Sequence, residues 1–120
     1  PLSHHQENPA KIEKLVKVQN FHTKVFAGFL DRLAAAKDGD GSLLDHSIIL
    51  FGSNMSNSDK HNNDPLPSAV FGRAYGKIKG GQHVKYPQNT PHANLLVTLA
   101  QRMGVPLEKM ADSTGVLSEV

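Results

Sequence analysis

Residues 47–64 read SIILFGSNMSNSDKHNND, an apolar run followed directly by a long polar loop. The apolar part, Ser47 to Phe51, is short, uninterrupted and rich in residues that favour β-structure. Such a run is typical of a strand that is covered on both faces in an α/β sheet. The loop leaves the carboxyl end of this strand, where open α/β sheets place their ligands. We therefore expect a buried strand over 47–51 and a functional site in the loop after it.

A long helix is expected before this strand. Asn8 and Pro9 form an N-cap followed by proline at the first helical position. The apolar residues from Ile12 to Leu33 keep helical spacing, which predicts a helix over 9–37. The Asp-Gly-Asp-Gly-Ser segment at 38–42 then ends the helix in a turn that connects it to the strand.

Shorter elements are expected after the loop. Residues 68–71 are predicted to form a second short strand, and the residues that flank Gly80-Gly81 over 77–85 are predicted to form a two-residue hairpin. Thr90-Pro91 repeats the cap-plus-proline signal and opens an apolar stripe that ends at glycine, which predicts a helix over 91–103. Together these elements predict an α/β domain.

Length and composition fit one globular unit. The chain has 120 residues, of which 38% are hydrophobic and 20% are charged, so it can form a single domain or the C-terminal fragment of a larger domain. The start at Pro1, close to the first helix, favours a fragment. No apolar stretch is long enough for a membrane span. The net charge is only +2 and the Lys and Arg residues are scattered, which does not favour nucleic-acid binding.

The loop after the first strand carries the best candidates for metal ligation. The chain has seven histidines and no cysteine, so a metal site must use His, Asp, Glu or Asn. The loop holds Asp59, His61 and Asp64 together with four asparagines, at 54, 57, 62 and 63. Imidazole nitrogens and carboxylate oxygens ligate zinc and similar ions. The alternative is that these polar residues cap turns and bond their own backbone, and the sequence leaves both open.

Other histidines offer weaker signals. His4 and His5 are adjacent, and in an extended segment their side chains point in opposite directions, so at most one enters a given site. Either they belong to a solvated terminus or they have a role in the intact protein. His22 and His92 lie on apolar helical stripes, where a partly buried structural imidazole is expected.

Several short motifs occur in an order that resembles one known family. They are Ser3-His4-His5, the loop that ends in His61 with Leu66-Pro67, the stretch GKIKGGQHVKYP at 76–87, Thr90-Pro91 with Asn94-Leu95, Arg102-Met103-Gly104-Val105, and Asp112-Ser113-Thr114-Gly115. In this order and spacing they resemble the HxxSHH family, the bacterial domain of unknown function 1552. The resemblance covers the whole chain and corresponds to the C-terminal portion of longer family members. The first histidine of the family motif would lie just outside this chain.

The resemblance implies a fold and an activity. The family looks related to the alkaline phosphatase and sulfatase superfamily, whose members are α/β/α sandwiches that hydrolyse phosphate or sulfate esters with divalent metals held by Asp and His. By this resemblance Asp59 and His61 are the first candidate metal ligands, and His4 and His5 are the second. The cofactor would be zinc, manganese, magnesium or calcium. The superfamily's nucleophile comes from earlier strands, so no catalytic residue is assigned in this chain.

The resemblance also implies surroundings and leaves two hypotheses. The partners would be the remainder of the parent polypeptide and a small anionic ester substrate, and the location would be periplasmic or extracytoplasmic. One hypothesis is a metal-dependent hydrolase of phosphate or sulfate esters. The other is a non-catalytic exported binding or structural protein on the same scaffold, since a fold alone does not establish a reaction. Nucleic-acid binding, which requires a contiguous Lys and Arg face, ranks below both.

Overall fold

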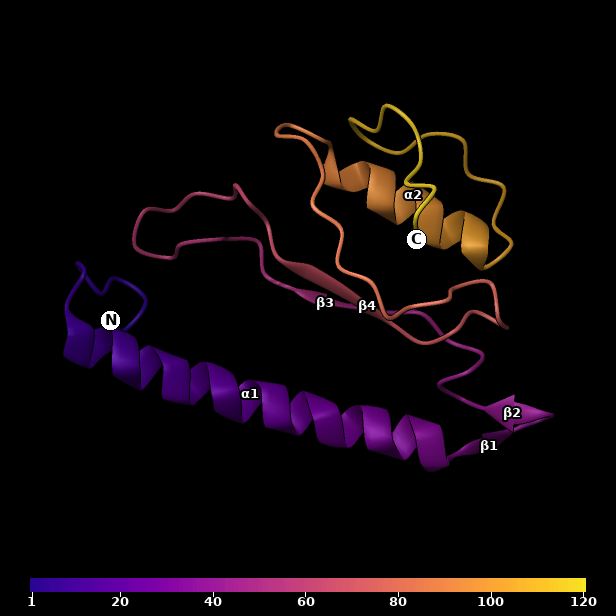
Figure 1. Ribbon diagram of the computed structural model, residues 1–120, viewed down its shortest axis with the longest axis horizontal. Coiled ribbons are helices and arrows are strands. Elements are labelled where there is room, and N and C mark those ends of the chain that lie inside the picture. The colour runs from indigo at the N-terminus through magenta and orange to yellow at the C-terminus, as the bar shows by residue number, and fades with distance from the viewer.

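The computed structural model describes residues 1–120 as two helices and two small antiparallel sheets. In chain order the elements are α1 (Pro9–Ala35), β1 (Lys37–Asp38), β2 (Gly41–Ser42), β3 (Ile49–Gly52), β4 (Ser68–Phe71) and α2 (His92–Arg102). Figure 1 shows β3 and β4 between the two helices, with α1 along one side of the molecule and α2 on the other. The prediction of a mixed helix and strand domain is confirmed at this coarse level.

The two ends of α1 follow from local sequence. The Asn8 side-chain oxygen accepts hydrogen bonds from two backbone N–H groups of the first turn, at 3.0 and 3.2 Å, and Pro9 occupies the first helical position. The helix ends at Ala35, two residues before its predicted end, because Lys37 already pairs with Ser42 in the β1–β2 hairpin. The predicted turn at 38–42 therefore exists and includes this hairpin.

The strand predicted over 47–51 forms as β3, but the prediction that both of its faces are buried is wrong. β3 pairs only with β4, antiparallel, from Ile49 opposite Phe71 to Gly52 opposite Ser68. Leu50 and Phe51 each remain 37% exposed. A sheet of two strands has two open edges and little area for covering layers, so its side chains cannot all be enclosed.

The β3–β4 sheet contacts a different helix on each face. On one face, the ring of Phe26 from α1 stacks on Phe51 with centroids 4.1 Å apart and meets the edge of Phe71 at 5.2 Å. On the other face, Ile48 and Val70 pack against the hydrophobic core. That core is a small cluster of five buried residues: Ala74, Ile78, Leu95, Leu99 and Leu117. The core therefore lies on the α2 side of the sheet.

Buried polar groups attach α2 to the C-terminal tail. The Asn94 side chain donates to the Thr114 hydroxyl and accepts from the Thr114 backbone N–H, at 3.2 and 2.8 Å. The Thr98 hydroxyl accepts from the Leu117 backbone N–H at 2.8 Å. The predicted helix is confirmed within one residue at each end, and its side-chain hydrogen bonds position the tail over the core.

The hairpin predicted over 77–85 is wrong. Gly80 and Gly81 do adopt positive φ angles of 67° and 69°, as a tight turn requires, but the flanking residues form no strands. Their partners lie in the tail, because the Gln82 side chain donates to the Glu119 backbone carbonyl and the Tyr86 hydroxyl donates to the Glu119 carboxylate at 3.2 Å. The segment is therefore held by the tail and has no partner strand.

A sharp turn follows β4 at Gly72, whose φ is +91°. A Cβ at this position would overlap the backbone carbonyl oxygen of Ser47, so only glycine fits. After the turn, the backbone N–H groups of Ala74 and Tyr75 donate to the carbonyls of Ser47 and Asp45, at 3.2 and 2.9 Å. The residues after β4 are thereby attached to the residues before β3.

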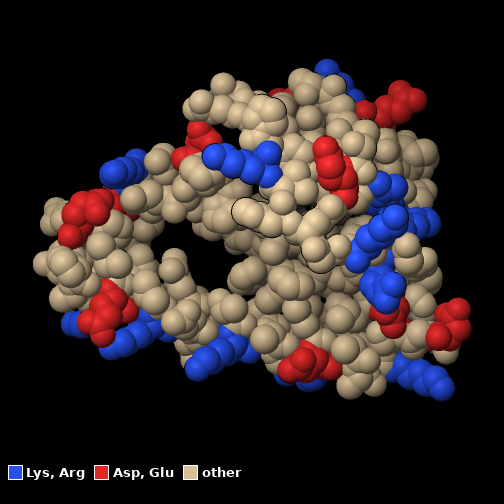
Figure 2. All heavy atoms as spheres, in the orientation of Figure 1, with Lys and Arg blue, Asp and Glu red and all other residues tan.

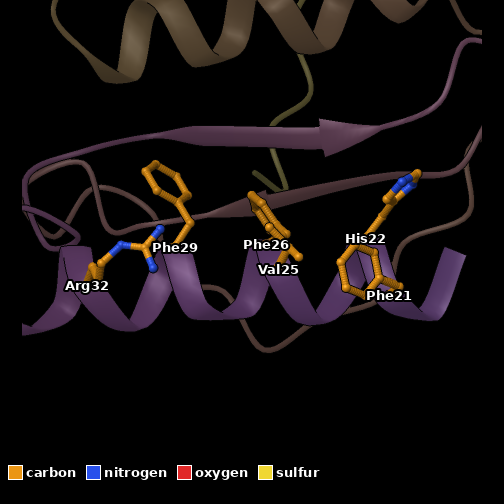
Figure 3. A pocket seen from close by; sticks show the side chains of 6 residues that line it. All are labelled: Phe21, His22, Val25, Phe26, Phe29 and Arg32. Carbon is orange, nitrogen blue, oxygen red and sulfur yellow. The ribbon is translucent and has the colours of Figure 1, made fainter. Parts of the chain in front are cut away.

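The helix α1 has no buried residue. Phe21 is 64% exposed and Val25 is 55% exposed. Figure 3 shows the open apolar groove along this helix, which is lined by Phe21, His22, Val25, Phe26, Phe29 and Arg32. Because His22 and also His92 are exposed, the prediction that their imidazoles are partly buried is wrong.

Candidate metal site

The N-terminal segment before α1 lies against the loop after β3. The Ser58 hydroxyl donates to the Ser3 backbone carbonyl at 2.9 Å, and the Gln6 backbone N–H donates to the Asp59 carboxylate at 3.0 Å. These contacts join residues that are more than fifty positions apart in the sequence. We call the contact between residues 3–7 and residues 57–62 the N-terminal clasp.

Two imidazoles face each other in the clasp. The Nε2 atoms of His4 and His61 are 3.0 Å apart, with the rings edge to face at a centroid distance of 5.0 Å. Two nitrogens bound to one tetrahedral zinc at 2.0–2.1 Å would be separated by about 3.3 Å. Both side chains are exposed, so an ion can reach the pair from solvent. The Nδ1 atom of His4 lies 3.2 Å from the Ser3 hydroxyl, which orients the ring.

A second group of donors adjoins this pair. One ligand atom from each of His5, Glu7 and Asp59 lies within 4.8 Å of the other two. His5 is buried, at 8% exposure, and its Nδ1 accepts a hydrogen bond from the Glu7 backbone N–H at 3.1 Å. The Nε2 atom is therefore the nitrogen that His5 keeps for another partner. His4 and His5 thus reach different partners, as adjacent residues in an extended segment are expected to do.

The backbone of the clasp is held in an uncommon conformation. Gln6, Glu7 and His61 have φ angles of 52°, 54° and 52°, in the left-handed region that non-glycine residues rarely occupy. Each such residue costs about 1 kcal/mol or more, and the surrounding contacts must compensate this cost. Two of the three strained residues, Glu7 and His61, are also candidate ligands.

The asparagines of the loop form turns. The Asn57 side-chain oxygen accepts from the backbone N–H groups of Asp59 and Lys60, at 2.9 and 3.1 Å, and the Asn62 side-chain oxygen accepts from the Asn57 N–H at 3.0 Å. These bonds present Asp59 and His61 on a short bridge between 57 and 62. The sequence left open whether the polar residues of the loop form turns or ligate a metal. Asn57 and Asn62 form turns, whereas Asp59 and His61 lie between them with side chains that do not cap these turns.

Four candidate ligands lie in the clasp, in two groups, and one candidate lies outside it. His4, His5, Asp59 and His61 all lie in the clasp. Asp64 lies outside it, because its carboxylate accepts from the Gln88 side chain at 2.8 Å. Glu7 was missed by sequence reasoning. Its position two residues after His5 is the signal that could have identified it.

Positive charge also lies near the donors. The Lys11 ammonium is 3.5 Å from the His4 backbone carbonyl, and Lys60 separates Asp59 from His61. The clasp therefore combines imidazole, carboxylate and ammonium groups at one end of α1. Such a set can hold a divalent cation and attract an anion to it.

Comparisons with protein-family models, with curated proteins and with solved structures each give no match. Neither helix combines the length and apolarity needed to cross a lipid bilayer. Figure 2 shows Lys and Arg side chains interspersed with Asp and Glu over the face in view.

Proposed function

We propose that the N-terminal clasp is a divalent-metal site and that the intact protein is a metal-dependent hydrolase of phosphate or sulfate esters. The observation that carries the proposal is the 3.0 Å approach of His4 and His61, beside the group formed by His5, Glu7 and Asp59. The His4–His61 pair and the His5–Glu7–Asp59 group each join residues 3–7 to residues 57–62, so an ion held by either would fasten two segments that are distant in sequence.

The donor set fits a first-row divalent ion. Imidazole nitrogen suits zinc, and the carboxylates of Glu7 and Asp59 extend the range to manganese, magnesium or calcium. The histidine pair favours zinc among these ions. When bound, such an ion would stabilise negative charge on an ester oxygen. The residues of this chain would hold the ion, and the ammonium groups of Lys11 and Lys60 would attract an anionic ester.

The ester chemistry rests on the resemblance to the HxxSHH family and through it to alkaline phosphatases and sulfatases. On this proposal the chain is the C-terminal part of an α/β/α sandwich, and the nucleophile comes from the remainder of the parent polypeptide. The exposed groove of α1 and the open edges of the β3–β4 sheet are compatible with further layers. A periplasmic or extracytoplasmic location is part of the same proposal.

A second candidate is a non-catalytic exported protein in which the clasp has only a structural role. The observation that favours it is that several of the candidate ligand atoms already have hydrogen-bond partners in the protein. The Glu7 N–H donates to His5, the Gln6 N–H donates to Asp59, and the two exposed imidazoles bond each other. Contacts of this kind can fasten a terminal segment without any ion.

Metal content and zinc or manganese affinity separate the two candidates. They are measured by elemental analysis and calorimetry on the full chain, on His61→Ala, His4→Ala and Glu7→Gln, and on the control His83→Ala. His83 is an exposed histidine with no hydrogen-bond partner, so this control removes an imidazole without touching the clasp. Loss of one imidazole ligand is expected to weaken binding at least tenfold, and the control should bind as the parent chain does.

Ester hydrolysis is then assayed on the longest natural form of the protein, with phosphate and sulfate esters. Metal binding that His61→Ala abolishes, together with hydrolysis, supports the full proposal. Binding without hydrolysis supports the metal site and refutes the enzyme. If the parent chain binds no metal while its circular dichroism spectrum shows folded helix and strand, the metal site is refuted and the structural clasp is supported.

A further inference from the structure

The corner between α1 and β3 contains a histidine that the proposed metal site does not use. The turn at 43–47 is attached to α1, because the backbone N–H groups of Leu43 and Leu44 donate to the carbonyls of Ala36 and Leu33, at 2.9 and 3.3 Å. It is also bonded to the residues after β4, as described above. This corner therefore determines how α1 meets the sheet, and His46 lies in it.

The His46 ring is mostly covered by its neighbours. Its side chain is only 11% exposed, and the ring stacks on Tyr75 with centroids 4.3 Å apart and an interplanar angle of 10°. Its Nδ1 lies 2.9 Å from a carboxylate oxygen of Asp38, on β1, and its Nε2 lies 3.3 Å from one of Asp40, at the hairpin tip. A Cβ on Gly41 would come within 2.9 Å of Nε2, so the ring lies directly against the hairpin backbone.

The chemistry of these contacts decides the protonation state that fits them. A carboxylate can only accept hydrogen bonds, whereas a neutral imidazole has one N–H donor and one lone pair. Both contacts are satisfied only when both ring nitrogens carry a proton. With a single proton, the lone pair of one nitrogen faces a negatively charged oxygen, and that contact becomes repulsive.

Charged groups of both signs face the ring from the neighbouring elements. The hairpin contributes Asp38 and Asp40, the turn contributes Asp45, and the segment after β4 contributes Arg73 and the neutral Tyr75. Ser42 hydrogen bonds lower the pKa of Asp45, and Arg73 and His46 lower it further, so Asp45 is a carboxylate at neutral pH. Three carboxylates and one guanidinium therefore lie around the ring, so the net charge of its surroundings is negative.

We propose that His46 is a pH-operated latch, in which the doubly protonated ring fastens the β1–β2 hairpin to the corner between α1 and β3. Loss of one proton breaks the more exposed contact, between Nε2 and Asp40, while the ring can keep donating its remaining N–H to Asp38. The hairpin tip then opens more often. Histidine is the side chain that ordinarily changes charge between pH 5 and 8, and this sets the pH range of the test.

The test uses the full chain and two NMR measurements between pH 5 and pH 8. The ring nitrogen-15 shifts of His46 report whether both nitrogens are protonated. Amide hydrogen exchange at 38–42, corrected for the intrinsic effect of pH, reports the opening of the hairpin. The variants are Asp40→Asn and His46→Asn, and the control is Asp112→Asn, which removes the same charge from an exposed position without a side-chain partner.

In the parent chain, corrected exchange at 38–42 is expected to rise roughly two- to fivefold as the ring loses its second proton, as for a partly exposed charge pair. Asp40→Asn should lower the pH of that change, His46→Asn should abolish it, and Asp112→Asn should leave it in place. Exchange that does not follow ring protonation refutes the latch, as does a change that persists in His46→Asn. If His46→Asn does not fold, Asp40→Asn alone decides, because an unchanged pH dependence in that variant also refutes the latch.

Discussion

Phe26 is expected to be the main attachment of the middle of α1 to the sheet. It contacts two aromatic rings, those of Phe51 and Phe71, although no residue of the helix is fully buried. Each aromatic pair contributes about 0.5–1.5 kcal/mol beyond burial. Burial of a partly enclosed phenylalanine adds about 1–2 kcal/mol. We therefore expect Phe26→Ala to lower the free energy of unfolding by about 3 kcal/mol.

Phe21→Ala is the matched control for this prediction. Phe21 lies on the same helix and is 64% exposed, with His22 as its only aromatic neighbour at 6.2 Å. Alanine raises helix propensity equally at both positions, so this effect cancels in the comparison. Urea denaturation followed by circular dichroism should show a change below about 1 kcal/mol for the control. Equal losses in the two variants would refute the conclusion that Phe26 fastens α1.

Three further changes test the corner and the tail. Gly72→Ala should destabilise the chain by at least about 3 kcal/mol in thermal melts, because left-handed backbone and the carbonyl overlap both oppose a Cβ; a loss below 1 kcal/mol contradicts this. Ser42→Ala should raise the lowered pKa of Asp45 toward 3.8, since the Ser42 hydroxyl is its largest cause. The stability that this lowered pKa gives is present above pH 3.8 and lost as the pH falls through the folded value, so the variant should lose part of it; an unshifted carboxyl titration by NMR contradicts this. Burial, and then Glu119, raises the pKa of Tyr86 above 10.0, so the associated stability is present below pH 10 and lost as the pH rises through the folded value. Glu119→Gln should lower that pKa partway in an NMR titration of the ring, and no change would rule out the carboxylate as a cause.

The elements that sequence predicted correctly depend on neighbours along the chain. Both helices follow from apolar spacing and from a proline at or just before the first helical position, and α2 also ends just before Gly104. The predicted Thr90 cap of α2 does not form, because the Thr90 hydroxyl donates to the Pro87 carbonyl. The signals that succeeded act within a few residues. The errors concern partners chosen across the fold. The burial of β3 depends on how many strands flank it, and Gly80-Gly81 permits a turn without determining that Tyr86 bonds the tail.

For the candidate site, too, the sequence indicated the residue types but not the contacts between distant segments. Residue type alone identified His61 and Asp59 as possible ligands, and the adjacent pair His4 and His5 was visible at the chain start. The meeting of these two segments was not visible, because it depends on α1 returning the N-terminus to the loop. Glu7 became a candidate only through that meeting.

The N-terminal clasp also makes α1 part of a closed loop of the chain. The bond between Ser3 and Ser58 closes a loop of 55 residues that contains α1, the hairpin and β3. The entropy of closing a loop grows only with the logarithm of its length, so a few contacts can maintain this closure. While it holds, α1 is tethered at both ends. Once it opens, the N-terminal end of α1 is no longer tethered, and an ion that bridges His4 and His61 would close the loop again.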